Sequence, residues 1–99
     1  MKIWFDMDGT IADLYGVDNW LDDLQNERTR PYKEAKALFR LSTLSRLLHK
    51  AQEQGHEIGI ISWTSKNGCD EYNFEVSTVK MWWLNKHMKS VQWDTVLIV

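Results

Sequence analysis

The sequence predicts an α/β fold in which parallel strands alternate with helices. Three apolar segments, residues 2–6, 57–63 and 91–99, have the length and composition of strands, and helical patterns separate them. The middle segment is almost entirely apolar, which is typical of a parallel-sheet strand covered on both faces. This alternation indicates a doubly wound α/β fold with right-handed crossovers, and the 99 residues suit one domain covering residues 1–99.

Before the second strand, the pattern favours two helical segments. A short helix is expected near residues 18–25, with Asp18 capping its first turn. Pro31 disfavours helix at the residue before it. A longer helical region then runs from about residue 33 to residue 54, with Ser42 as a candidate cap for a fresh helix inside it.

After the second strand, residues 64–69 are interpreted as a loop and residues 70–89 as a helix. Apolar side chains recur every three or four positions in that helix, which places them on one buried face. Six tryptophans in so short a chain indicate large buried areas in the core or at an interface rather than a base-stacking platform. The residues of the buried helical face are Tyr72, Val76, Val79 and Trp83.

Composition narrows the classes of function. The formal charge of −2 comes with acidic and basic residues interspersed, so binding of nucleic acid through phosphate neutralisation is not expected. No apolar run approaches the ~20 residues that span a bilayer, and the first residues meet Asp6 too early for a signal peptide. Cys69 is the one cysteine, which rules out an internal disulfide and fits a reducing, cytoplasmic setting.

The strongest chemical signal is Asp6-Met7-Asp8-Gly9-Thr10, at the end of the first strand. Asp6 and Asp8 would repel each other unless a cation or a phosphoryl group lies beside them. Gly9 permits a sharp turn and a close approach of backbone amides to a ligand. The pattern indicates an oxygen-ligand Mg²⁺ site with a carboxylate nucleophile, and an acidic, solvated turn is the alternative.

Ser62 supplies a second part of the same site, because it ends the second strand. The carboxyl ends of parallel strands meet at one edge of the sheet, where ligands of open α/β sheets bind. The Ser62 hydroxyl and the backbone amides that follow it can hold a phosphate oxygen without adding charge. The alternative is that Ser62 merely starts a turn.

Together these residues resemble the haloacid dehalogenase-like hydrolase superfamily. The first family signature, Asp-x-Asp-Gly-Thr after the first strand, is matched in full by residues 6–10. The second, a Ser or Thr that ends the second strand, is matched by Ser62. Residues 11–14 and the later Arg30-Pro31-Tyr32 are similar to segments of small nucleotidase-like members. The resemblance covers essentially the whole chain and implies a three-layer, Rossmann-like core with a minimal cap or none.

The resemblance implies a role for each matching residue. Asp6 would be the nucleophile that forms an aspartyl-phosphate, and also a ligand of Mg²⁺. Asp8 would be the general acid and base, with its backbone carbonyl as a second Mg²⁺ ligand. Ser62 and the amide of Trp63 would bind the phosphoryl oxygens of a small phosphorylated substrate, for which a nucleotide monophosphate is the first expectation.

Two further family signatures lack an evident match. The family has a lysine that steadies the nucleophile and an acidic pair beyond a fourth strand, and both usually follow the third strand. This chain ends at Val99, inside that strand. Lys66, in the loop after Ser62, is the candidate for the lysine, and no acidic pair is recognised. We therefore expect a truncated member, either a fragment or a naturally shortened protein, with low or no turnover.

The truncation also predicts how the chain assembles. In the family order the first strand lies between the second and the fourth. Without a fourth strand its apolar edge is free to pair with another chain, which predicts a homodimer. Residues 13–32 supply at most a small helical flap, so the site should be fairly open.

Three other interpretations stay open. The chain could be a non-catalytic binding or assembly module that acts through its tryptophan-rich surface. It could be a phosphotransferase or phosphomutase with the same aspartyl-phosphate, which nothing in the sequence separates from a hydrolase. Cys69 could be a nucleophile with His49, His56 or His87 as its base, although the sequence places no histidine near it.

Overall fold

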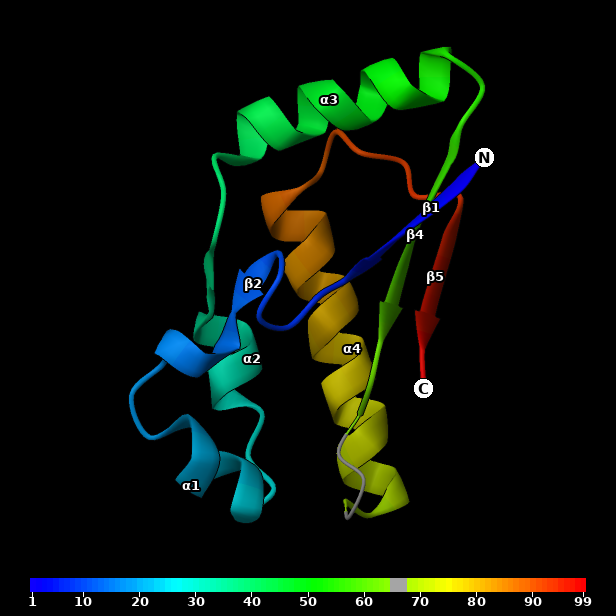
Figure 1. Ribbon diagram of the computed structural model, residues 1–99. Coiled ribbons are helices and arrows are strands. Elements are labelled where there is room, and N and C mark those ends of the chain that lie inside the picture. Colours follow the sequence, from blue (N-terminus) through cyan, green and yellow to red (C-terminus); the bar gives the residue numbers. More distant parts are fainter. Residues whose placement is uncertain (65–67) are drawn as a thin grey trace.

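The computed structural model describes residues 1–64 and 68–99 and shows a mixed α/β fold (Figure 1). Its centre is a three-strand sheet in the order β1–β4–β5, formed by β1 (Lys2–Asp6), β4 (Glu57–Ser62) and β5 (Thr95–Ile98). Both strand pairings are parallel, which confirms the predicted parallel sheet. The carboxyl ends of the strands therefore meet at one edge of the sheet, and β1 is an edge strand, as expected.

Two long helices connect these strands. α3 (Leu41–Glu53) precedes β4, and α4 (Asp70–His87) joins β4 to β5. Gly55 follows α3 with φ +88°, a left-handed conformation that glycine adopts without strain and that ends the helix. The predicted buried face of α4 is confirmed, because all four of its residues are buried: Tyr72, Val76, Val79 and Trp83.

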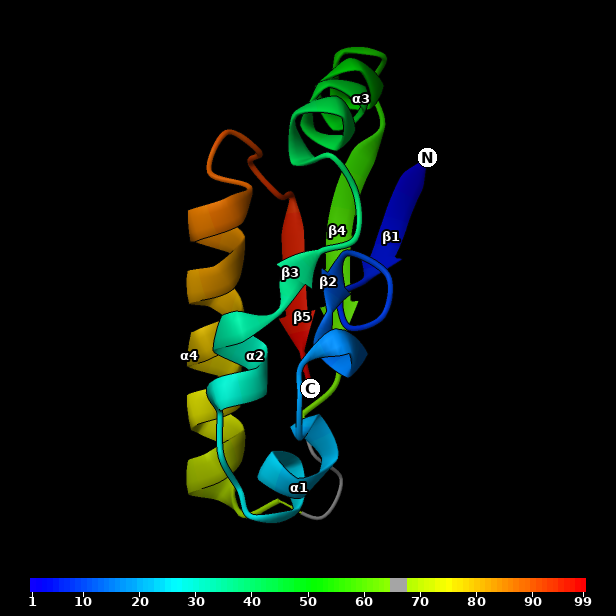
Figure 2. The ribbon, with the colours of Figure 1, turned by 90° about the vertical axis from the view of Figure 1, so that its left-hand side faces the viewer.

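Between β1 and α3 the chain forms a small flap, residues 12–37, which is longer than the helical flap expected over residues 13–32 and includes two short strands. Its two short strands pair with each other in antiparallel fashion, and short helical turns lie between them (Figure 2). The flap therefore closes on itself instead of joining the main sheet. Its elements are β2 (Ala12–Asp13), η1 (Leu14–Gly16), α1 (Trp20–Gln25), α2 (Arg30–Glu34) and β3 (Lys36–Ala37).

The predicted helix over residues 33–54 is wrong in its first third. α2 ends at Glu34, because Ala35 is extended with ψ 132° and β3 then pairs with β2. This tertiary pairing overrides the local helical pattern. α3 begins only at Leu41, with Arg40 rather than Ser42 at its N-cap.

The start of the first flap helix also differs from the prediction. α1 starts after Asn19, whose φ of 63° is left-handed, and not after Asp18. Asn19 forms no side-chain capping bond. The preceding turn, and not an aspartate cap, therefore sets the beginning of this helix.

In the described part of the chain the helices lie on one side of the main sheet (Figures 1 and 2). The core forms on that side, where Trp83 is fully buried and its Nε1 donates to the Ala35 carbonyl at 2.8 Å. The opposite face carries Trp4 and Leu97, which are 39% and 42% exposed. The described residues thus form two layers, where the sequence had predicted three.

Candidate active site

The chain turns sharply after β1 around a single carbonyl. The amides of Ile11 and Ala12 both donate to the carbonyl oxygen of Met7, at 2.9 Å each. Gly9 has φ +79°, and a Cβ at this position would lie 2.9 Å from the ring of Tyr15. The predicted requirement for glycine is confirmed, and the turn fixes the second carboxylate of the motif at the carboxyl edge of the sheet.

A buried lysine joins the two predicted halves of the site. Lys80, on α4, is fully buried, and its Nζ donates to Asp8 Oδ2, to Ser62 Oγ and to the Trp63 carbonyl, each at 2.7 Å. Its Nζ also lies 5.1 Å from the centre of the Tyr32 ring. An ammonium has three donors, so all three are used here. The second carboxylate of the motif and the strand-end hydroxyl therefore share one cation.

This environment changes the acidity of Asp8. Burial raises the pKa of Asp8 above its ordinary value, and the charge and hydrogen bond of Lys80 only partly oppose that increase. The nearby carboxylate of Asp6 raises the pKa further. A carboxyl group with a raised pKa holds a proton more readily, which is the property required of a general acid.

Both carboxylates open into a cavity of about 290 Å³. Most of its wall comes from the flap, whose Tyr15 and Trp20 rings pack edge to face with centroids 4.9 Å apart. The cavity thus combines an acidic floor with an aromatic wall. Its lining residues are Asp6, Asp8, Leu14, Tyr15, Trp20, Leu24, Tyr32, Trp63 and Thr64.

The predicted phosphate-binding residues occupy different positions. Trp63 lines the cavity and its side chain is 65% exposed. Ser62 is fully buried and meets the site through Lys80, since its hydroxyl accepts the hydrogen bond from the ammonium. Lys66, the candidate for the missing lysine, lies outside the described residues.

The oxygen donors of this site are compatible with Mg²⁺. Among the residues that the structure describes, no group of three or more His, Cys, Asp or Glu side chains is arranged to hold a metal. Mg²⁺ in proteins often takes only one or two carboxylates and keeps several waters. The exposed carboxylate of Asp6 and the backbone carbonyl of Asp8 fit such a sparse ligand set.

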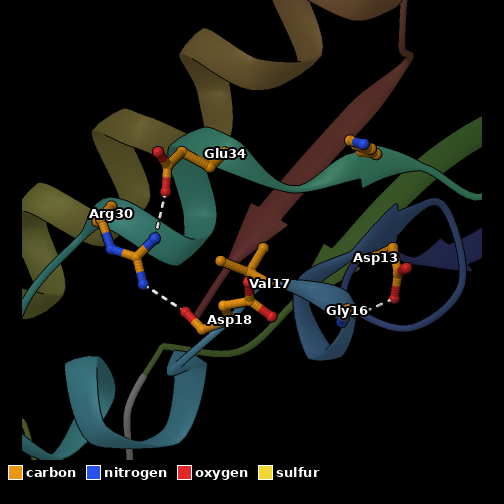
Figure 3. Close-up of a pocket in the computed structure, with 7 residues that line it drawn as sticks. Asp13, Gly16, Val17, Asp18, Arg30 and Glu34 are labelled. Carbon is orange, nitrogen blue, oxygen red and sulfur yellow. Dashed lines mark hydrogen bonds and ion pairs between the residues drawn. The ribbon is translucent and has the colours of Figure 1, made fainter.

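A second pocket, of about 490 Å³, lies on the flap (Figure 3). Arg30 lines it, but the guanidinium donates to Glu34, to the backbone carbonyl of Asp18 and to Asp23. Asp23 is buried and also accepts a hydrogen bond from Arg28 at 3.0 Å. These contacts join α1 to α2, so this charge cluster holds the flap together and does not offer Arg30 to a ligand.

The described contacts give no support to a cysteine nucleophile. Cys69 caps α4, and its Sγ lies 3.0 Å from Glu27 Oε2. His49 contacts the Ser90 carbonyl, and the ring of His87 packs on Trp83. No hydrogen bond between Cys69 and a histidine occurs within residues 1–64 and 68–99.

Lys80 is the residue of this site that sequence reasoning missed. It lies four positions after Val76 and three before Trp83, so it belongs to the apolar face predicted for α4. Lysine is almost never fully buried without a partner. A lysine inside an apolar helical face was therefore the available signal for a buried anionic partner.

None of the described helices is both long and apolar enough to cross a bilayer. Comparisons with protein-family models, curated proteins and solved structures found no match. The choice of a function therefore depends on the residues and their geometry.

Proposed function

We propose that this chain is a Mg²⁺-dependent phosphomonoesterase of the haloacid dehalogenase type that acts through an aspartyl-phosphate. The observation that carries the proposal is the contact of Lys80 with both Asp8 and Ser62, beside a cavity that Asp6 lines. Lys80 supplies a cation next to the paired carboxylates, which is the component that the sequence had not revealed. Because no acidic pair completes the metal site among the described residues, turnover should be slow.

The two aspartates divide the chemistry between them. A carboxylate oxygen of Asp6 forms a bond to phosphorus while the ester P–O bond breaks, and Asp8 gives its proton to the departing oxygen. Asp8, now ionised, takes a proton from a water molecule that attacks the aspartyl-phosphate. This step releases inorganic phosphate and restores both side chains. The raised pKa of Asp8 supports its assignment as the proton donor.

Lys80 serves this chemistry without a free donor. All three of its hydrogen bonds go to protein atoms, so it acts through its positive charge and by holding the carboxyl group of Asp8 in place. Mg²⁺, held by Asp6 and the Asp8 carbonyl, would offset charge between the phosphoryl oxygens and the nucleophile.

The wall of the cavity supports a substrate with a planar group. Four aromatic side chains line the cavity above the carboxylates, and flat rings pack favourably on one another. A nucleotide monophosphate has such a ring attached, through its sugar, to the phosphoryl group. We therefore propose nucleotide monophosphates ahead of sugar phosphates as substrates. The four aromatic residues are Tyr15, Trp20, Tyr32 and Trp63.

The test is phosphate release from nucleotide monophosphates and sugar phosphates, with Mg²⁺ and with a chelator. Asp6→Asn removes the nucleophile, and Asp18→Asn, at an exposed aspartate outside the cavity, is the matched control. We expect Mg²⁺-dependent release that Asp6→Asn abolishes and Asp18→Asn preserves. Equal release by the wild-type chain and Asp6→Asn contradicts the proposal.

A non-catalytic binding module is the second candidate, and the uncovered face of the sheet favours it. Trp4 and Leu97 are exposed on that face, where a partner could pack. Under this alternative, the chain releases no phosphate from any ester, with or without Mg²⁺. The phosphate-release assay therefore separates the two candidates.

A further inference from the structure

A groove of about 560 Å³ lies between α3 and the end of α4, on residues that the proposed function does not use. In Figure 1 the C-terminal end of α4 is directed toward the N-terminal half of α3. The side chains that matter here are Ser42, Ser45 and Arg46 on one side and Lys86, His87 and Lys89 on the other.

The groove is positively charged although the chain as a whole is not. Arg46, Lys86 and Lys89 line it, and no described carboxylate does, whereas the formal charge of the chain is −2. Within residues 1–64 and 68–99, none of these three cations forms an ion pair. Lys86 packs over the ring of Trp82, with its Nζ 4.8 Å from the ring centre. An anion in the groove would relieve the mutual repulsion of the cations.

The start of α3 adds to this positive field. The 13-residue helix has Arg40 at its N-cap, with no side-chain capping bond and no acidic residue in its first turn. Ser42, in that turn, lines the groove. The positive end of the helix dipole thus lies at the groove without a protein anion to offset it.

A serine hydroxyl also lines the groove. Ser45 is 8% exposed as a residue and lies among the groove residues. Its Oγ–H is a donor that an oxygen of a ligand in the groove would accept.

We propose that this groove binds a small molecule that carries phosphoryl groups. Arg46, Lys86 and Lys89 pair with its oxygens, and Ser45 donates a hydrogen bond to it. The volume and the three cations suit two linked phosphoryl groups better than one, so pyrophosphate should bind more tightly than inorganic phosphate. This site is separate from the cavity at Asp6 and does not depend on the proposed function.

The test is calorimetric titration with pyrophosphate and with inorganic phosphate at low ionic strength. The chain carries Asp6→Asn and the buffer contains a chelator, so that the proposed catalytic site contributes neither its nucleophile nor a metal. Arg46→Ala should weaken pyrophosphate binding about tenfold, the loss of one charge-assisted hydrogen bond. The matched control is Lys50→Ala, an exposed cation on the same helix that does not line the groove, and it should change the affinity less than about twofold.

The pKa of His87 gives a second measure of anion binding that is independent of calorimetry. Burial lowers the pKa of His87, and the positive charge of Lys86 lowers it further. The other charged or titratable groups lining the groove are Arg46, Lys89 and His49. A bound anion should raise the pKa of His87, which proton NMR follows by titration. The upward shift should disappear in Arg46→Ala.

Three results would overturn the proposal. Pyrophosphate fails to bind the wild-type groove, or Arg46→Ala and Lys50→Ala weaken binding equally, or sulfate binds as tightly as pyrophosphate. The second result would indicate general charge attraction, and the third an unselective anion site. Thermal unfolding of each variant confirms that it is folded before its affinity is compared.

Discussion

The ammonium of Lys80 lies 2.7 Å from the carboxylate of Asp8, although 72 positions separate the two residues in the chain. The Lys80 side chain is fully buried and that of Asp8 is only 16% exposed. Removing one partner of such a pair leaves the other charge buried and unpaired, which is strongly destabilising. This contact therefore connects the stability of the fold with the chemistry of the site.

Substitution Lys80→Met tests both consequences, because methionine keeps the bulk of the side chain and removes its charge. We expect the free energy of unfolding to fall by about 3 kcal/mol, measured by urea denaturation. Phosphate release should fall at least about a hundredfold under conditions in which the variant is folded. Lys50→Met, at an exposed lysine on α3, is the control and should change neither quantity. A folded Lys80→Met chain with wild-type activity would remove Lys80 from the mechanism.

Gly59 should tolerate no side chain while Trp4 covers it. A Cβ at position 59 would lie 2.7 Å from two ring carbons of Trp4 and 3.2 Å from the Thr95 carbonyl. Gly59→Ala should therefore lower the free energy of unfolding by about 1–3 kcal/mol. The cost should be smaller in a Trp4→Ala background, because the ring is then absent. If the two substitutions change the free energy of unfolding additively, then a contact other than the one with the Trp4 ring excludes a side chain at position 59.

The flap should loosen in acid. Burial alone would raise the pKa of Asp23, but the hydrogen bonds and charges of Arg28 and Arg30 outweigh it, so the pKa lies below its ordinary value. This stabilisation is present above the ordinary pKa of an aspartate, about 3.9, and is lost as pH falls through the lower pKa of the folded state. Hydrogen-exchange protection factors in residues 12–37, which correct for the intrinsic pH dependence of amide exchange, should fall over that interval. In Asp23→Asn, the protection factors in the flap should be lower at neutral pH and respond less to acid.

Trp63 should contribute to the choice of substrate. Its side chain lines the cavity, while only its backbone carbonyl contacts Lys80, so truncation leaves that hydrogen bond in place. If the chain is active, Trp63→Ala should raise KM for nucleotide monophosphates about tenfold and leave KM for sugar phosphates nearly unchanged. Trp82→Ala, at another exposed tryptophan, is the control. Equal changes for both substrate classes would indicate a structural effect instead.

The free edge of β1 should bring two chains together. Within residues 1–64 and 68–99, β1 pairs with β4 on one side only, and an unpaired parallel edge invites another strand. We expect a mass approaching that of a homodimer as concentration rises, measured by light scattering. A monomeric mass at the highest accessible concentration would rule out pairing through this edge.

The architecture and several site positions followed from local sequence patterns. Apolar runs located the three parallel strands, although β5 occupies only Thr95–Ile98 of the predicted residues 91–99. The position of Ser62 at the end of β4 predicted its approach to the Asp8 region. The spacing of apolar residues also predicted the buried face of α4. These features depend on short-range periodicity, which the sequence displays directly.

Other features depend on contacts between distant segments. β3 pairs with β2 across the flap, and this pairing interrupts a helical pattern that extended through residues 36 and 37. The role of Lys80 depends on the close approach of α4 to the ends of β1 and β4. Periodicity assigns a residue to a face of a helix but does not identify its partner. The sequence pattern therefore did not reveal that Lys80 contacts Asp8 and Ser62.

The pairing of β1 with β4 also constrains the order in which the protein folds. Lys2 is paired with Glu57, so the first strand has no sheet partner until the second half of the chain has been synthesised. Non-local parallel pairing of this kind forms slowly, because a long loop must close before any contact is gained. During that interval the apolar residues of β1 are exposed to other chains. Newly made protein should therefore aggregate most readily before β4 leaves the ribosome, and a chaperone that shields apolar strands should raise the yield of folded protein.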